Sequence, residues 1–437
     1  MTITEKFRPY PKYKDSGVEY LGKVPEHWGV KKIKHNTYVK GRIGWQGLKS
    51  EEFIDEGPYL VTGTDFVNGH VNWDSCYHVA KDRYDQDPYI QLREKDLLIT
   101  KDGTIGKTAI VFDMPDKACL NSGIFLTRPI KPEYISKYMY WLLNSAVFIN
   151  FIDYMKTGTT INHLYQNVFV EFAYHIPEIN EQLQIAQFLD NETSRIDNLI
   201  EKKNRQIELL QEKRSALITH VVTKGLNPNV KMKDSGVEWI GEIPEGWEVK
   251  RLRYVFKNMD HRRVPLSAEE RSYMEKKYPY YGASGVIDTV DNYLFDEPLL
   301  LVAEDGANLL SRSSPLAFIA EGKYWVNNHA HILKPKLGSI KFWEGVMQCY
   351  DYTPLISGAA QPKLTAEKLS NIFVPLPEKN EQIQIAQFLE KETSKIDTLI
   401  SKIQFSIDKL TEFRTALISA AVTGKIDVRN WKKEAAS

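Results

Sequence analysis

Apolar residues recur at heptad spacing in two stretches of the chain, around residues 196–221 and 396–421. The steps between them alternate between three and four residues, and both stretches keep the same register. This spacing predicts two helices, each with a coiled-coil seam over about four heptads. The predicted seam residues are Ile196, Ile200, Ile207, Leu210, Arg214 and Leu217 in the first stretch, and Ile396, Ile400, Ile403, Ile407, Leu410, Arg414 and Leu417 in the second.

Boundary signals indicate where these helices begin and end. Proline and then asparagine precede each apolar pattern, in "IPEINEQ" and "LPEKNEQ", and a glycine follows each pattern, in "TKG" and "TGK". Since asparagine caps helix starts and glycine ends helices, we predict helices over 179–225 and 379–425. Each helix could instead pack on its own domain, but the arginine repeated at one seam position favours helix against helix.

The helices belong to an internal repeat that covers most of the chain. The segment "KDSGVEYLGKVPEHWGVKK" (14–32) returns as "KDSGVEWIGEIPEGWEVKR" (233–251), and "LLITKDG" (97–103) aligns with "LLVAEDG" (300–306). The helix opening "NEQLQIAQFL" returns as "NEQIQIAQFL" 200 residues later. A period of this length is too long for a solenoid and predicts duplicated domains with a pseudo-twofold relation.

The parts outside the helices are expected to be mixed α/β. Short apolar runs such as "DLLITKDG" and "SGIFLTRPI" predict strands that end at Gly and Asp turns. Aromatic-rich helical patterns at 133–155 and 339–353 each precede a loop of small residues, at 156–164 and 356–364. The predicted segments are a first domain (1–178), a first helix (179–225), a second domain (226–378), a second helix (379–425) and a C-terminal tail (426–437).

Composition narrows the class of protein. A chain of 437 residues that is 42% hydrophobic and 26% charged is typical of a globular protein with several domains. No apolar run is long enough to span a membrane and the N-terminus has no signal core, so we expect no membrane association and a cytoplasmic location. The three cysteines form no C-x-x-C pair, which argues against a cysteine zinc site.

Net charge bears on nucleic-acid binding. The chain has 57 basic and 57 acidic residues, whereas a nonspecific nucleic-acid binder usually has a basic excess. The balance lowers the expectation of such binding, although it leaves room for local basic faces. It is easier to reconcile with DNA binding if partner subunits supply much of the phosphate contact.

Two loops resemble cofactor motifs only in part. The sequence "DGTIGKT" (102–108) ends like a phosphate-binding loop, but Lys101 stands where the first glycine is required. The sequence "DPYI" (87–90) lacks the second proline of the D-P-P-Y loop of amino-methyltransferases. A hairpin and a plain turn are the better interpretations, so we predict no cofactor-binding or catalytic residue in this chain.

Other conspicuous residues also have ordinary explanations. His329 and His331 in "NNHAH" would share one face of a strand, but no third metal ligand is evident, so we predict no metal site. Asp102 and Asp305 stand at matched positions before glycine, which is first of all a turn signal. Trp28 and Trp247, also matched, are expected to anchor the core of the two leading segments, 14–32 and 233–251.

The whole arrangement resembles the specificity subunit of type I restriction-modification systems. The resemblance rests on "NEQ.QIAQFL..ETS.ID.LI" opening each long helix, and on "GTTINHL", "RSALITHVVT", "RTALISAAVT" and "YYGASGVIDTVDNYLF...AEDGANL". It covers essentially the whole chain. It implies an α+β fold with two pseudo-symmetric mixed α/β target recognition domains, separated by two long antiparallel coiled-coil helices.

The family's function is implied in the same way. Each domain would read one half of a split, asymmetric site on double-stranded DNA. The helices would form a spacer and dock two methyltransferase (M) subunits, and two restriction (R) subunits would complete the complex. S-adenosylmethionine, ATP and magnesium would then belong to those partners and not to this chain.

Base readout favours Arg, Lys, Asn, Gln and polar loop residues, while phosphates bind Lys, Arg and backbone amides. On these grounds the first domain offers Arg42, Trp45, Gln46, Lys101, Thr104, Lys107, Thr159, Thr160, Asn162 and His163 as DNA contacts. The second offers Arg262, Arg263, Asn308, Arg312, Asn327, Asn328, His329, Gln361 and Lys363.

Two other functions stay open on the sequence. One is a coiled-coil protein-interaction scaffold without DNA specificity, which a zero net charge would suit. The other is an enzyme, a diverged P-loop ATPase or methylase, which would bind nucleotide or S-adenosylmethionine as an isolated chain.

Overall fold

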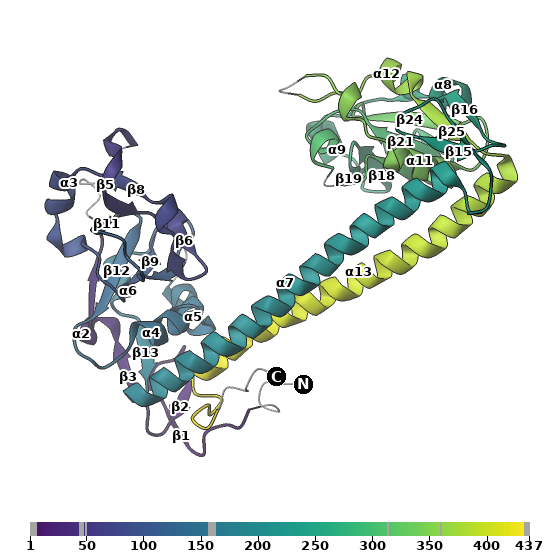
Figure 1. The fold of residues 1–437 in the computed structure, drawn as a ribbon. Helices are drawn as coiled ribbons and strands as arrows, with labels where there is room; N and C mark the ends of the chain where they lie inside the picture. The colour runs from purple at the N-terminus through teal and green to yellow at the C-terminus, as the bar shows by residue number, and fades with distance from the viewer. Residues whose placement is uncertain are drawn as a thin grey trace. The chain divides into compact units, whose positions relative to one another are not determined.

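A computed structural model describes residues 7–42, 48, 50–155, 163–312, 314–358 and 361–431. The chain forms two compact units: unit 1 is Met1–Lys203 with Phe405–Ser437, and unit 2 is Asn204–Gln404. Each unit therefore holds one globular domain and a segment of each long helix (Figure 1). The boundary between the units lies within the helices, whereas the sequence segmentation treated each helix as a separate segment.

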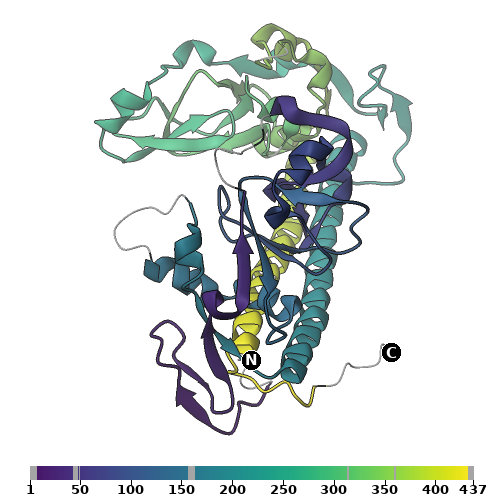
Figure 2. The same cartoon turned by 90° about the vertical axis from the view of Figure 1, so that its left-hand side faces the viewer.

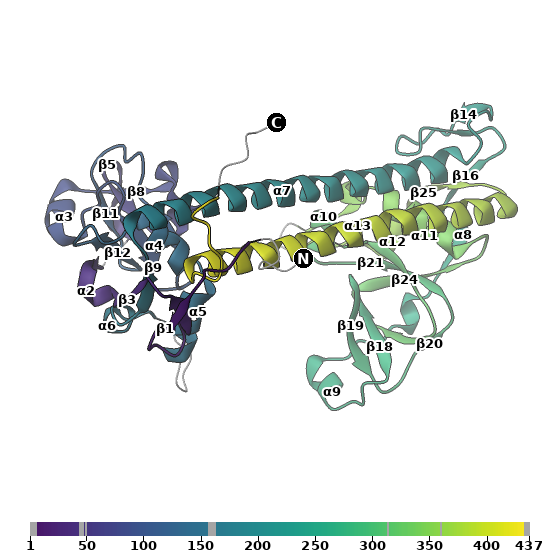
Figure 3. The ribbon, with the colours of Figure 1, turned by 90° about the horizontal axis from the view of Figure 1, so that it is seen from below.

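The long helices are α7 (Ile179–Lys224) and α13 (Lys379–Val422). Within each unit their segments lie side by side (Figure 3). In unit 1 the guanidinium of Arg414 donates to Asp197 at 2.8 and 3.1 Å. In unit 2 Arg214 donates to Asp397 at 3.0 Å, and Gly225, just after α7, faces Glu381 near the start of α13. The helix segments are thus antiparallel, and the coiled-coil prediction is confirmed.

Burial along α7 follows the heptad register. Between residues 201 and 217 the side chains partly shielded from solvent are Lys203, Ile207, Leu210, Arg214 and Leu217, and their neighbours are exposed. On α13 the predicted seam residues Ile396, Ile400, Ile403, Ile407, Leu410, Arg414 and Leu417 are likewise all buried or half-buried. The paired Arg and Asp side chains lie at the rim of the seam, where such ion pairs contribute about 0–1 kcal/mol each.

The main sheet of unit 1 is covered on both faces. Its strand order is β4 (Thr37–Lys40), β12 (Ile124–Pro129), β9 (Leu97–Thr100), β10 (Thr108–Ile110), β7 (His70–Val71) and β6 (Phe66–Val67). Leu97 and Ile99 pack into the cluster that includes α4 (Ser136–Leu143), while Leu98 points into a second cluster. Because alternate strand residues face opposite sides, a continuous apolar run is what this strand requires.

Smaller elements complete unit 1. A second sheet has the order β11 (Ala118–Leu120), β5 (Phe53–Val61) and β8 (Tyr77–Val79). The strand pairs are β13 (Ala173–Ile176) with β3 (Gly29–Lys32), and β1 (Tyr13–Asp15) with β2 (Lys23–Pro25). The remaining helices are α2 (Ile33–Asn36), α3 (Lys81–Asp85), α5 (Ala146–Met155) and α6 (Gln166–Phe169).

Unit 2 repeats this plan. One sheet has the order β17 (Phe256–Asn258), β24 (Ala330–Pro335), β21 (Leu299–Ala303) and β22 (Ala317–Ala320), and the other β19 (Gly285–Val290), β18 (Tyr278–Gly282), β23 (Lys323–Val326) and β20 (Phe295–Asp296). The strand pairs are β16 (Glu248–Arg251) with β25 (Phe373–Leu376), and β14 (Met232–Asp234) with β15 (Glu242–Pro244). The helices are α8 (Leu252–Val255), α9 (Ala268–Ser272), α10 (Asn308–Ser311), α11 (Ile340–Cys349) and α12 (Ala366–Asn371). The predicted mixed α/β class is confirmed in both units.

The two leading segments dock against the ends of the long helices. Trp28 and Trp247 are buried, as predicted. A Cβ at Gly424 would lie 2.3 Å from Pro25 and 3.3 Å from Trp28, and a Cβ at Gly225 would lie 3.3 Å from Trp247. Figure 2 shows the purple N-terminal segment beside the yellow end of α13. In unit 1 the leading segment therefore packs against residues that follow α13, and in unit 2 the matched segment packs against residues that follow α7.

Over the part of the chain that the structure describes, no helix combines the length and the apolar character needed to cross a bilayer.

His175 in β13 gives unit 1 a sensitivity to acid. Its ring is buried with neither nitrogen hydrogen-bonded, and burial lowers the pKa of His175 to about 4. Because the unfolded histidine has a pKa near 6.5, protons bind the unfolded chain preferentially between these values, and stability falls as pH drops through this range.

We expect His175→Leu to remove this loss without leaving a buried polar group unsatisfied. Urea unfolding measures the free energy of unfolding of the variant minus that of the wild type. This difference should be about 2–3 kcal/mol larger at pH 4.5 than at pH 7.5. The same stability difference at both pH values would contradict a neutral buried histidine.

Candidate nucleic-acid interface

In unit 1 the loop 101–107 joins β9 to β10 and is tied to the segment that begins at His163. The His163 ring hydrogen-bonds to the Asp102 carboxylate, and the two residues form a backbone bridge. The amide of Leu164 donates to the carbonyl of Lys101 at 2.8 Å, and the amide of Lys101 donates to Gly123 at 2.9 Å. Three segments distant in sequence therefore meet at this loop.

The candidate side chains on this loop differ in exposure. Lys101 is half-buried, its ammonium lies 5.1 Å from the centre of the Phe125 ring, and burial lowers the pKa of Lys101. Thr104 and Lys107 are exposed, and the Lys107 ammonium donates to the carbonyl of Gly63 at 3.3 Å. Thr104 and Lys107 can reach a ligand as they stand, whereas Lys101 would have to leave the aromatic ring.

Arg42 requires a correction. Its side chain is only 1% exposed, and its guanidinium donates to the carbonyl of Leu120 at 2.9 Å and to the sulfur of Cys119 at 3.5 Å. A core arginine held in this way cannot contact DNA, so Arg42 is a structural residue. Trp45, Gln46, Thr159, Thr160 and Asn162 lie outside the described residues.

In unit 2 the matched loop is held in the same way. Asp305 forms a backbone bridge with Lys363, the residue that the repeat aligns with His163. The amide of Leu364 donates to the backbone carbonyl of Glu304 at 2.7 Å, and the amide of Glu304 donates to the backbone carbonyl of His329 at 2.9 Å. The His329 ring lies 2.8 Å from the Asp305 carboxylate. Asp102 and Asp305 thus serve as more than turn residues, because each anchors a second segment to its loop.

The other candidates in unit 2 divide by accessibility. Asn328, His329, Gln361 and Lys363 are exposed around this loop, with the His329 ring bonded to Asp305 and the Lys363 ammonium paired with Glu304. Arg262 is exposed as well, but its guanidinium donates to the carbonyl of Leu294 at 2.9 Å and lies 4.5 Å from the centre of the Phe295 ring. Arg312 is exposed too, but its guanidinium donates to the carbonyl of Tyr350 at 2.7 Å.

The side chains of two predicted DNA contacts in unit 2, Asn327 and Asn308, form hydrogen bonds to backbone groups. The side-chain oxygen of Asn327 accepts the amide of His329 at 2.8 Å, and Asn327 is only 4% exposed. The Asn308 side chain accepts the amide of Ser314 at 2.9 Å and donates to its carbonyl at 3.2 Å. Both therefore shape the loop in place of presenting a free amide.

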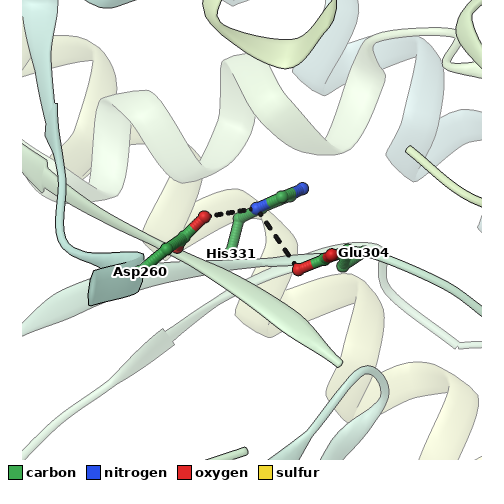
Figure 4. Close-up of side chains that lie close together, drawn as sticks. All are labelled: Asp260, Glu304 and His331. Atoms are coloured by element: carbon green, nitrogen blue, oxygen red, sulfur yellow. Dashed lines mark hydrogen bonds and ion pairs between the residues drawn. The ribbon is translucent and has the colours of Figure 1, made fainter. Parts of the chain in front are cut away.

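Asp260, Glu304 and His331 form a charged cluster (Figure 4). His331 is buried, with Nδ1 2.7 Å from Asp260 and Nε2 2.8 Å from the carbonyl of Leu364. Glu304 lies 3.6 Å from Nδ1. Since a carbonyl only accepts, Nε2 carries a hydrogen. Burial raises the pKa of Asp260, but hydrogen bonds from His331 and Asn258 outweigh it, so the pKa lies below its ordinary value.

Two cations compensate these carboxylates. The guanidinium of Arg263 hydrogen-bonds to Glu304, donates to the carbonyl of Ala330 at 2.9 Å and lies 3.6 Å from Asp260. Lys363 lies 3.1 Å from Glu304. The oxygen and nitrogen atoms of Asp260, Glu304 and His331 lie within 4.8 Å of one another, a spacing that a metal could use. Arg263 and Lys363 already supply positive charge there, so a structural ion-pair network is the better interpretation.

Asp260 and Glu304 in unit 2 and Asn121 in unit 1 were not predicted from the sequence. Asp260 and Glu304 are far from His331 in sequence, and only the fold brings them to it. Asn121 aligns with Asn327 when "LNSGIF" is placed over "VNNHAH", and its side-chain oxygen accepts the amide of Ser122 at 2.7 Å. Alignment of the two copies over this strand would have found Asn121.

Comparisons with known proteins agree with the duplicated plan. The family described as "Type I restriction modification DNA specificity domain" matches residues 26–209 and 244–409. The type I restriction enzyme MjaVIII specificity subunit of Methanocaldococcus jannaschii is 26% identical over 447 residues, covering 93% of this chain and 95% of the relative.

Two solved structures share the fold. A chain in a structure on complex assembly and conformational transition of the type I R-M system has a TM-score of 0.69 at 13% identity, covering 92% of this chain and 99% of the other. The HsdS subunit from Thermoanaerobacter tengcongensis has a TM-score of 0.50 at 14% identity, covering 94% and 100%. With both copies of the specificity domain matched, the chain belongs to the family of DNA specificity subunits of type I restriction-modification systems.

Proposed function

We propose that the chain recognises a bipartite, asymmetric sequence in double-stranded DNA, each globular domain reading one half. The observation that carries this proposal is the matched loop of the two units. The bridges from Asp102 to His163 and from Asp305 to Lys363 hold equivalent backbones in the two copies. A frame of one shape that presents different side chains is what reading two different half-sites requires.

The side chains on this shared frame differ in charge and shape. In unit 1 Lys101 lies over the Phe125 ring. In unit 2 the aligned residues are Glu304, in place of Lys101, and His331, in place of Phe125. Thr104 and Lys107 are exposed on the first loop, whereas Lys363, Asn328 and His329 surround the second. Because each base pair presents a distinct donor and acceptor pattern in the major groove, two such surfaces would prefer different bases.

The long helices would dock two methyltransferase subunits. The repeated helix openings expose apolar residues at matched positions, Leu183 with Ile383 and Leu199 with Leu399. Surface residues of this kind, repeated in both copies, would offer two similar contact areas to two copies of one partner. Association with other subunits is the subject of the solved type I R-M structure to which this chain is similar.

Chemistry would then reside in the partners. We propose that methyl transfer with S-adenosylmethionine belongs to the two M subunits, and ATP- and magnesium-dependent restriction to two R subunits. This chain supplies sequence recognition and is not itself the catalyst. A subunit that reads chromosomal DNA would act in the cytoplasm.

We also propose that the helices set the gap between the half-sites. One helical turn advances 5.4 Å, which corresponds to roughly 1.6 base pairs of duplex DNA. Lengthening both helices by one turn should therefore lengthen the gap by one or two base pairs.

Selection of duplexes from a random pool by the full chain with its methyltransferase partners tests the proposal. We expect enrichment of two fixed blocks with a constant gap of free sequence, surviving in 150 mM salt because base contacts add to phosphate contacts. Partner binding without any enriched sequence would favour the scaffold. Binding of nucleotide or S-adenosylmethionine by the isolated chain would favour the enzyme.

A further inference from the structure

A matched surface in the two units differs in charge. In unit 1 it lies on β3, α2 and the residues just before β13. Lys32 and Lys34 both donate to Glu171, at 2.9 and 2.6 Å. These hydrogen bonds lower the pKa of Glu171 to about 2, so the glutamate is ionised at neutral pH. One carboxylate therefore compensates two lysines in unit 1.

In unit 2 the same three positions hold two arginines and an amide. The guanidinium groups of Arg251 and Arg253 both donate to the side-chain oxygen of Asn371, at 3.1 and 2.9 Å. Asn371 aligns with Glu171, so the contact keeps its geometry and loses its negative charge. Within the described ranges neither arginine forms an ion pair with a carboxylate.

Neighbouring positions increase the difference. In unit 1 Glu133 pairs with Lys31 at 2.6 Å, so the paired groups are three lysines and two glutamates, with a charge of +1 among these five side chains. In unit 2 Lys250 pairs with Glu248 at 2.9 Å. The ammonium of Lys336 donates to the backbone carbonyl of Arg253 at 2.9 Å, which adds a further cation to this surface. Four cations against one glutamate give a local charge of +3.

Aromatic rings hold the arginines of unit 2 in place. Arg251 lies 5.1 Å from the centre of the Phe373 ring, and Arg253 lies 5.1 Å from the centre of the Tyr254 ring. Both rings are exposed, and with Val249 and Lys250 they line a hollow of about 410 Å³. Hydrogen bonding and charge from Arg253 lower the pKa of Tyr254, as expected where positive charge is uncompensated. Stacking pre-orders the guanidinium groups, so less entropy is lost when an anion binds.

We propose that Arg251, Arg253 and Lys336 bind phosphates of duplex DNA beside the half-site read by unit 2, a contact that unit 1 lacks. This inference rests on the proposed function. These three residues, with Asn371, Tyr254 and Phe373, are called the basic patch below. Arg forks match phosphate oxygens, and the aligned lysines of unit 1 are held by carboxylates instead.

Position favours DNA over an acidic protein. Helix α12 starts just after the loop that carries Gln361 and Lys363, and it ends at Asn371 in the basic patch. Its six residues span about 9 Å, roughly three base pairs, so a duplex seated on the loop extends toward the patch. Figure 1 shows α12 beside α8, which carries Arg253 and Tyr254.

The salt dependence of DNA binding tests the proposal. Full-length chain with its partners is titrated with a random duplex from 50 to 200 mM KCl. Loss of two phosphate contacts in R251Q/R253Q should reduce the slope of log affinity against log salt by about 1.8, so the wild type loses about 12-fold more affinity over this range. N371E, which installs the carboxylate of unit 1, should also reduce the slope, while R251K/R253K should keep it.

The matched control is K32Q/K34Q in unit 1, whose lysines Glu171 already compensates; its slope should equal that of the wild type. An unchanged slope in R251Q/R253Q, with a wild-type circular-dichroism spectrum, overturns the proposal. Loss of methyltransferase co-purification with unchanged DNA slope overturns it in favour of an acidic protein partner. Failure of the wild type to prefer any duplex sequence would instead count against the proposed function, since the salt slope does not depend on sequence.

Discussion

Exchange of residues 40–170 for the matched segment of a relative with another specificity should change one half of the methylated sequence and leave the other half intact. The exchanged segment contains the loop of Lys101, Thr104 and Lys107 and the segment that ends near His163, but none of unit 2. Each mismatched base pair typically costs about 1–3 kcal/mol, so a changed block of three would reduce affinity for the original site by at least a hundredfold.

The reciprocal exchange in unit 2, over residues 259–370, is the matched control and should change only the other half. Methylated adenines are mapped in cells that express each chimaera with its partners. Simultaneous change of both halves by either exchange would refute independent reading. The ring contacts of Phe148 and Phe151 with Phe172 cross the boundary of the exchanged segment, so a relative with matching core residues should be used.

Arg263→Ala should be among the most destabilising single substitutions in unit 2. Arg263 is mostly buried and its guanidinium is held by Glu304 and the carbonyl of Ala330. Removing it leaves Glu304 and Asp260 with less compensating charge in a poorly solvated position. Breaking a buried pair in this way typically costs about 3–5 kcal/mol, which for a unit of this size lowers Tm by roughly 6–20 °C.

The neighbouring Arg262 provides the control. It is exposed and lies 3.9 Å from Glu297, so Arg262→Ala should cost about 1 kcal/mol or less. Calorimetry of both variants measures the difference, and DNA affinity at 10 °C separates stability from binding. Equal Tm values for the two variants would show that the network around His331 contributes little. Normal stability with lost affinity would instead indicate that Arg263 contacts DNA, as the sequence predicted.

Acid should weaken the same network. The pKa values of Asp260 and Glu304 lie below their ordinary values, because hydrogen bonds and positive charge from His331, Arg263 and Lys363 outweigh the effect of burial. Carboxylates with lowered pKa contribute stability that is present above the pKa of the unfolded chain and is lost as pH falls through the folded pKa. The Tm difference between Arg263→Ala and the wild type should therefore shrink in acid below about pH 4.

Local sequence was enough for the long helices but not for the loops. The heptad pattern predicted the coiled coil because side chains three and four residues apart share a helix face whatever the rest of the chain does. Its repeated Arg214 and Arg414 indicated contact between helices, although their partners Asp397 and Asp197 could not be identified from spacing. Partner choice depends on the antiparallel register, which no single helix encodes.

For the candidate site, local sequence did not determine which residues are accessible. Arg42 has the chemistry of a DNA contact, but its exposure was decided by the strand that carries Cys119 and Leu120, distant in sequence. Asp102 was expected to serve a turn, and it also anchors His163 from 61 residues away. Residue type indicates what a side chain can bind, whereas tertiary packing decides whether it is free to do so.

A map of methylated adenines in cells that express this chain with its methyltransferase partners tests the central claim most directly. Two modified blocks of different sequence, separated by a constant number of unspecified base pairs and absent when the chain is deleted, are the predicted result. A single continuous motif, or a pattern that persists without the chain, would contradict recognition of a divided site by its two domains.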